Sequence, residues 1–210
     1  MNKIIFSLSL LILSFGANAQ EAKLIQQVNF NAGKSFSGFL YKDANGNKDE
    51  NLDFRSGNSY NLSVGLGFGA EHLVRPEIHY SEMGAKSSFL DIPIDWKLNY
   101  LGIGASYLYK VLYNESITLS PGLNISSDFL LKAEQTVGSA RYNLLENDAL
   151  KAWDLNAGLI LNSRFKVIES LFLSFEYRFQ MGLNQIEKKD EGEKSRNLGH
   201  KILLGLSFNI

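Results

Sequence analysis

The chain has 210 residues, no cysteine and a formal net charge of −1. The absence of cysteine excludes a disulfide framework, a thiol-based site and a lipid-modified cysteine, and the nearly balanced charge gives no indication of a nucleic-acid partner. A composition of 18 Gly, 14 Phe and 9 Tyr with only 3 Pro is typical of curved, aromatic-rich strands.

Residues 1–19 have the pattern of a cleaved secretory signal peptide. Lys3 gives a positive start, residues 4–15 are an apolar run broken only by serines, and Ala17-Asn18-Ala19 is a small-x-small cleavage site. The alternative, a membrane anchor, is less favoured because a spanning helix needs about 20 apolar residues. We therefore expect a mature chain that begins at Gln20 and forms one domain, residues 20–210.

From about Val28 onward, apolar and polar residues alternate with the period of a β-strand. In residues 59–70, for example, Tyr, Leu, Val and Phe occupy most of the even positions and Asn, Ser and Gly all of the odd ones. Eight such runs are predicted to be strands: residues 27–41, 59–70, 73–83, 98–110, 116–131, 152–165, 171–183 and 198–210.

The connections between these runs alternate between short and long. Short turns are expected near residues 70–72, 111–115 and 166–170, and long polar loops at 42–58, 84–97, 132–151 and 184–197. This alternation is typical of outer-membrane barrels, which have short periplasmic turns and long external loops. The sequence thus predicts an all-β fold, an eight-stranded antiparallel up-and-down transmembrane β-barrel, exported to a Gram-negative outer membrane and surrounded by its lipid and lipopolysaccharide.

Several charged residues fall on the predicted inward face of the barrel. Eight strands leave an interior just wide enough for side chains to fill, and an unpaired buried charge is costly. We expect these residues to pair and close the lumen; a narrow pore or a proton path along them is the alternative. The predicted lumenal charge network consists of Arg75, Glu77, His79, Asp128, Asp154, Arg164, Glu176 and Arg178, and Lys110 is assigned to the same face.

His79 and Ser81 raise the alternative of a lipid A-modifying enzyme, because lipid A deacylases are small barrels with a His-x-Ser pair on one strand. Side chains two residues apart on a strand point the same way, as a base and a nucleophile must. This pair shares the face of Arg75 and Glu77, however, whereas the acyl chain of the substrate lies in lipid. A non-enzymatic barrel with no catalytic residue, cofactor or metal is therefore predicted.

The segment from Asp43 to Asp49 has oxygen ligands at every second position, as calcium loops have. Its glycine, Gly46, stands at the fourth position of the segment, whereas an EF-hand loop requires glycine at the sixth. A solvated external turn is favoured, and calcium binding is left open.

The predicted loop 84–97 is the best candidate for an interaction site, because Phe89, Ile92 and Trp96 would be exposed there. An apolar cluster outside the membrane usually marks a partner, a lipid contact or a lid. The alternative is that the segment extends its two strands as a hairpin and packs on Tyr142 and its neighbours in the next loop.

The chain resembles the PorT-type outer-membrane β-barrel family of Bacteroidetes. The resemblance rests on the segment from Arg75 to Lys86, on Tyr100-Leu101-Gly102-Ile103 and on the terminal Leu204-Gly205-Leu206-Ser207-Phe208. It implies an eight-stranded barrel without a cofactor, and for relatives of PorT itself a role in type IX secretion and gliding. The resemblance leaves open a secretion accessory, an adhesin-like surface barrel and a structural element. A protein partner bound through the external loops is a further hypothesis.

Overall fold

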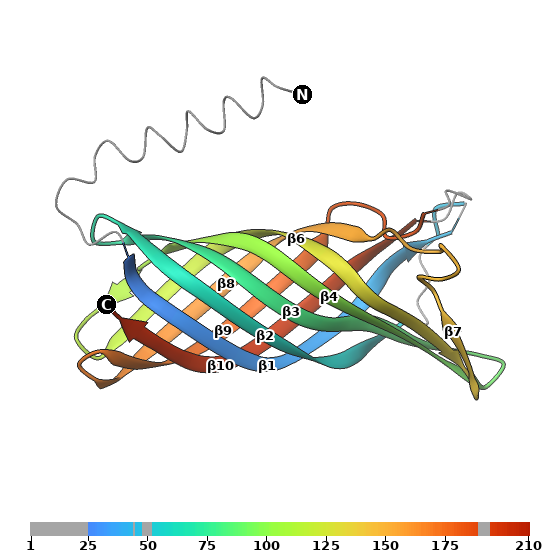
Figure 1. The fold of residues 1–210 in the computed structure, drawn as a ribbon, viewed down its shortest axis with the longest axis horizontal. Coiled ribbons are helices and arrows are strands. Elements are labelled where there is room, and N and C mark those ends of the chain that lie inside the picture. The colour runs from blue at the N-terminus through green and yellow to red at the C-terminus, as the bar shows by residue number, and fades with distance from the viewer. Residues whose placement is uncertain (1–24, 44, 48–51, 189–193) are drawn as a thin grey trace, which may run out of the picture.

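Eight long antiparallel strands close into a barrel (Figure 1). The computed structural model describes residues 25–43, 45–47, 52–188 and 194–210, so the predicted signal peptide lies outside the described residues. Each ring strand pairs with the next along the chain, and β1 pairs with β10 to close the ring. The ring strands are β1 Ile25–Lys42, β2 Asp53–Phe68, β3 His72–Phe89, β4 Ile92–Tyr109, β6 Ile117–Val137, β8 Trp153–Ile168, β9 Leu171–Gly182 and β10 Lys194–Asn209. The predicted fold class is confirmed.

The two ends of the barrel differ in their connections. Residues 69–71, 110–116 and 169–170 make short links at one end, which we call the turn end; the second of these links contains the two-residue strand β5, Leu112–Tyr113. Residues 43–52, 138–152 and 183–193 connect strands at the opposite end, the loop end, where the short strand β7, Ala140–Asn143, pairs with β6. The chain's C-terminus lies at the turn end, on the left of Figure 1.

The prediction of a long polar loop at residues 84–97 is wrong. β3 and β4 stay paired up to Phe89 and Ile92, and only Leu90 and Asp91 form the turn, with positive φ angles of 49° and 64°. Two consecutive left-handed residues suit the right-handed twist of a hairpin, but the usual sequence signal is Asn-Gly or Asp-Gly. The missing signal and the polar residues before the turn explain the error.

Strand lengths show that the barrel extends beyond a membrane at its loop end. β6 has 21 residues and β3 and β4 have 18 each, whereas a tilted membrane-crossing strand needs about 9–11. β4 remains paired with β6 as far as Val137. The β3–β4 hairpin and the end of β6 therefore form a three-stranded extension, which reaches the lower right of Figure 1 together with β7.

The predicted orientation of the side chains is confirmed along the ring. Outward-facing Leu62, Ile103 and Leu204 are 53%, 55% and 58% exposed, and polar residues that alternate with apolar ones, such as Asn61 and Asn124, are buried. Because a barrel in lipid places its apolar side chains outward and its polar ones inward, this is the arrangement of a transmembrane barrel. Among the described residues there is no helix with the length and hydrophobicity needed to cross a membrane.

The barrel interior is layered along its axis. An apolar cluster lies toward the loop end: Met83, Leu98, Tyr100, Leu130, Ala133 and Ile186. A smaller cluster of Leu73, Leu108 and Ile160 lies toward the turn end. On β3 the inward positions between Leu73 and Met83 are Arg75, Glu77, His79 and Ser81, all buried. A polar layer is therefore enclosed between two apolar ones.

Candidate functional site

Four charged side chains meet in the middle of the lumen. Arg75 and Glu77 of β3 point toward Glu176 and Arg178 of β9, and each of the four side chains is at most 1% exposed. Arg75 Nη2 lies 2.5 Å from Glu176 Oε2, and Arg178 Nη2 donates to Glu77 Oε2 at 2.7 Å. Arg178 also pairs with Glu176, its neighbour on β9. We call these four residues the central tetrad.

The tetrad joins opposite walls of the barrel. β3 and β9 are four strands apart in either direction around the eight-stranded ring, so they lie on opposite walls. Ion pairs between opposite walls cross the full width of the lumen. The tetrad consequently spans the lumen with groups that neutralise one another, which satisfies charges that would otherwise be costly to bury.

His79 and Asp128 extend this network toward the loop end. His79 Nε2 lies 3.0 Å from Asp128 Oδ1, and His79 Nδ1 lies 3.8 Å from Glu77 Oε1. Asn156 Nδ2 donates to Asp128 Oδ2 at 3.1 Å. Six of the eight predicted network residues therefore form one connected cluster.

Asp154 and Arg164 do not join that cluster. Asp154 Oδ2 accepts a hydrogen bond from Asn197 Nδ2 at 2.8 Å, near the loop end. Arg164 donates to Asn209 Oδ1 at 2.5 Å and lies 4.3 Å from the centre of the Phe172 ring, near the turn end. The two residues face the lumen as predicted but are not paired with a charged group.

Two further lysines belong to the inward face, one missed by the prediction and one at the rim of the barrel. Lys201 of β10 is only 3% exposed and faces the lumen, although it was not among the predicted residues. The alternation that places Ile202 and Leu204 outward would have identified it. Lys110, which was assigned to the inward face, follows the end of β4 and lines a cavity at the turn end with the inward Arg164; its Nζ donates to the Ala70 carbonyl at 3.1 Å.

The His79 and Ser81 side chains are both in the lumen, at 3% and 0% exposure. His79 contacts Asp128, whereas the Ser81 hydroxyl lies 3.1 Å from the hydroxyl of Ser59. A lipid acyl chain outside the barrel has no access to either group in this arrangement.

The described part of the predicted calcium segment is a tight turn. Asp43 Oδ1 accepts hydrogen bonds from the backbone N–H groups of Asn45 and Asn47 at 2.9 Å and 2.7 Å, and the Asn47 side chain donates to Oδ2 at 3.1 Å. These hydrogen bonds, that of the Asn47 side chain first, lower the pKa of Asp43. The carboxylate closes its own turn, and the described residues contain no group of three or more side chains suited to hold a metal.

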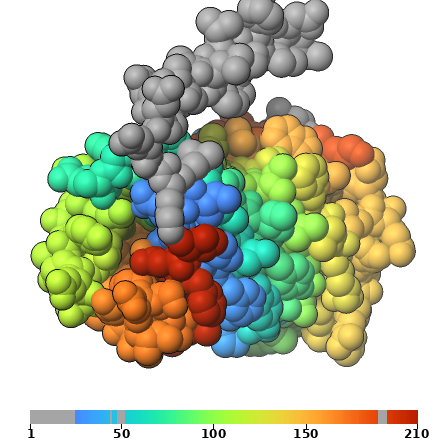
Figure 2. All heavy atoms as spheres, turned by 60° about the vertical axis from the view of Figure 1, so that its left-hand side comes forward, coloured from blue at the N-terminus to red at the C-terminus, as the bar shows by residue number. Residues whose placement is uncertain are grey.

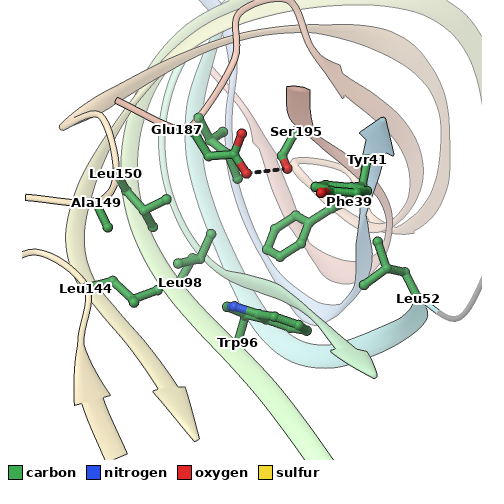
Figure 3. Close-up of a pocket in the computed structure, with 11 residues that line it drawn as sticks. Phe39, Tyr41, Leu52, Trp96, Leu98, Leu144, Ala149, Leu150, Glu187 and Ser195 are labelled. Atoms are coloured by element: carbon green, nitrogen blue, oxygen red, sulfur yellow. Dashed lines mark hydrogen bonds between the residues drawn. The ribbon is translucent and has the colours of Figure 1, made fainter. Parts of the chain in front are cut away.

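A cavity of about 400 Å³ lies at the loop end, above the apolar cluster (Figure 3). Its walls come from β1, β4, β10 and three loops, which only the closed ring brings together. Phe39 and Trp96 meet edge to face with ring centres 6.0 Å apart. The residues that line the cavity are Phe39, Tyr41, Leu52, Trp96, Leu98, Leu144, Ala149, Leu150, Ile186, Glu187 and Ser195.

Glu187 is the one carboxylate among the described residues that line this cavity. Its Oε1 accepts a hydrogen bond from the Ser195 hydroxyl at 2.7 Å, drawn as a dashed line in Figure 3. Its Oε2 is buried and has no hydrogen-bond partner among the described residues. A buried acceptor without a donor is costly, so a ligand that brings an N–H or O–H group to Oε2 would be favoured. No sequence signal identified Glu187 as a cavity residue. Its partner Ser195 is only eight positions away, but the apolar walls of the cavity, such as Phe39 and Trp96, are distant in the chain.

The three predicted interaction residues are separated by the hairpin. Phe89 and Ile92 flank the turn and are 68% and 46% exposed, and Leu90 in the turn is 80% exposed. Trp96 lies farther down β4 and lines the cavity instead. Leu144 and Leu145 pack on the apolar cluster beneath, while Tyr142 is exposed.

Comparisons with known proteins define the fold. No protein-family model and no curated protein matches the sequence. The crystal structure of Neisserial surface protein A (NspA) matches with a TM-score of 0.51 and 15% identity, over 87% of this chain and 97% of that one. OprG of Pseudomonas aeruginosa matches with a TM-score of 0.50 and 10% identity, over 88% and 96%.

The fold is that of the outer-membrane β-barrels. At these identities the likeness shows the fold alone. The resemblance to PorT-type barrels and the secretion role that it implies stay predictions.

Proposed function

We propose that this protein is a non-enzymatic, non-conducting barrel of the bacterial outer membrane that binds a small amphipathic ligand at its loop end. The turn end would face the periplasm and the loop end the outside, as in other barrels with short turns and long loops. The observation that carries the proposal is the apolar cavity with the buried, unpartnered oxygen of Glu187.

The lining of the cavity indicates the chemistry of the ligand. Ligand sites are mostly apolar with a few polar groups that fix orientation. Trp96, Phe39 and Leu150 would contact a hydrocarbon or ring, and Glu187 would accept a hydrogen bond from the head group. A primary amine fits best, because its positive charge also favours the carboxylate.

Two features support the non-conducting and non-enzymatic parts of the proposal. The central tetrad crosses the lumen with four buried, mutually paired charges. His79 and Ser81 face this closed interior rather than the lipid, where a lipid A-modifying enzyme would need them.

Trp96 provides a direct test of ligand binding. The chain has two tryptophans, and Trp153 is on the outer surface, so Trp153→Phe leaves Trp96 as the only indole reporter. We expect titration of this variant with octylamine to change its fluorescence saturably, and octanoate to bind more weakly. Glu187→Gln should reduce octylamine binding by about tenfold, since a hydrogen bond to a charged group contributes about 1.5–3 kcal/mol.

Two matched variants decide the outcome. Glu146→Gln removes an exposed carboxylate from the neighbouring loop and should leave the titration unchanged. Ala149→Phe should fill the cavity and abolish the response. Equal responses to octylamine in all variants would mean that the amine partitions into the detergent micelle and that the cavity is not a binding site.

We propose a second role for the loop end, as a docking surface for a protein partner such as a component of a secretion system. The observation that favours it is the apolar tip of the β3–β4 hairpin, where Phe89 and Leu90 are largely exposed. Exposed apolar residues that project beyond the membrane are common in interaction surfaces.

A further inference from the structure

The turn end holds a second cavity, of about 360 Å³, with a very different lining. Its walls are mainly polar and include two cations, Lys110 and Arg164, with Gln27 and Asn209. Figure 2 brings this end forward: the end of β10, in red, lies between the β8–β9 turn, in orange, and the start of β1, in blue.

Arg164 is held in a fixed orientation, yet it forms no salt bridge with any residue that the structure describes. It is 7% exposed, its guanidinium lies over the Phe172 ring, and one N–H donates to the neutral Asn209 side chain. Its Nε is buried without a hydrogen-bond partner. Among the described residues, no carboxylate oxygen forms a salt bridge with Arg164 within 4.0 Å.

Lys110 also contacts only neutral hydrogen-bond acceptors among the described residues. Its Nζ donates to the Ala70 carbonyl at 3.1 Å and to Gln26 Oε1 at 3.4 Å, and both acceptors are neutral. Two like charges on one small cavity repel each other, and a shared anion would convert that repulsion into attraction. A planar guanidinium beside an ammonium is suited to an oxyanion, which it binds through two parallel N–H groups.

We propose that the cavity at the turn end is a binding site for a phosphate group, held by Arg164 and Lys110. The site is separate from the cavity at the loop end and does not depend on ligand binding there. The phosphate could come from free phosphate in the periplasm or from a phospholipid headgroup of the inner leaflet; both present the same oxygens to the two cations.

Calorimetry on the refolded full-length barrel in a phosphate-free detergent tests the site. We expect saturable binding of inorganic phosphate, and a loss of affinity of about tenfold or more in Arg164→Gln. Lys110→Gln should weaken binding as well, and it keeps the test valid if the arginine variant does not fold. Lys166→Gln, an exposed cation two residues along β8, is the matched control and should bind as the unchanged protein does.

A second titration distinguishes free phosphate from a phospholipid headgroup as the bound anion. Saturation by phosphatidylglycerol in mixed micelles, with no further binding of inorganic phosphate, assigns the site to a lipid headgroup. The proposal is overturned if neither inorganic phosphate nor phosphatidylglycerol binds, or if Arg164→Gln and Lys110→Gln bind as the unchanged protein does.

Discussion

Gly102 shows how a single residue shapes the lumen. In the sheet register it lies directly between His79 of β3 and Asp128 of β6. A Cβ at Gly102 would lie 2.3 Å from both His79 Nε2 and Asp128 Oδ1. Because glycine leaves that space open, the two side chains can reach each other across the intervening strand, and the buried histidine gains a partner.

Gly102→Ala should break this contact by displacing one of the two side chains. We expect the free energy of unfolding to fall by about 1–3 kcal/mol, the cost of leaving a buried polar group unsatisfied, as measured by urea titration in detergent. Gly199→Ala is the control, because the nearest atoms to its Cβ are 3.3–3.4 Å away. If Gly102→Ala costs as much in an Asp128→Asn background as alone, the contact is not the cause.

The β3–β4 hairpin carries two separate groups of apolar side chains, which the sequence pattern had placed together in one loop. Its tip carries exposed Phe89 and Ile92, whereas Trp96 packs against Phe39 in the cavity wall. The continuous ladder between the two strands holds the tip away from the cavity. Changes at the two places should therefore have separable effects.

The double variant Phe89→Ser, Ile92→Ser should leave the melting temperature nearly unchanged, because exposed side chains contribute little to stability. Any protein partner recovered with the unchanged barrel by chemical cross-linking in cells should be lost. Trp96→Ala should behave in the opposite way, with lower stability from the lost packing, by about 2–4 kcal/mol. Destabilisation by the double variant would mean that the tip is a packing element.

At the scale of the whole molecule, the closed ring turns residues far apart in the chain into a barrier. Arg178 and Glu77 are 101 positions apart, yet they pair across the lumen. The apolar cluster toward the loop end adds a second barrier above the tetrad. Ions would have to pass both a neutralised polar layer and a packed apolar layer.

The purified barrel should show no stable conductance in planar bilayers, because side chains fill a lumen of eight strands. The double variant Met83→Ala, Leu98→Ala removes side-chain volume from the apolar cluster but leaves the tetrad in place. It should show no conductance if the ion pairs are sufficient to close the lumen. Replacing all four tetrad residues with Ser should allow small, brief openings. Large, steady channels from the unchanged protein would revive the pore hypothesis.

The sequence by itself determined the fold class and the side of each residue. Strand alternation is local, so the period of two in residues 59–70 is sufficient to place Leu62 outward and Asn61 inward. The same rule placed all eight predicted charged residues in the lumen and would have added Lys201. Strand ends were less well determined, because the polar part of the β3–β4 hairpin gave no strand signal.

Only the tertiary structure decided which inward residues meet. The alternation of odd and even positions tells which side of the strand a residue is on. It does not tell which residue lies opposite across the barrel, because that depends on ring closure, tilt and register. Closure produces the Arg178–Glu77 pair across the lumen, and it places Arg164 of β8 beside the neutral Asn209 side chain of β10. The candidate sites at the two ends exist because closing the ring brings distant segments of the chain to a common mouth.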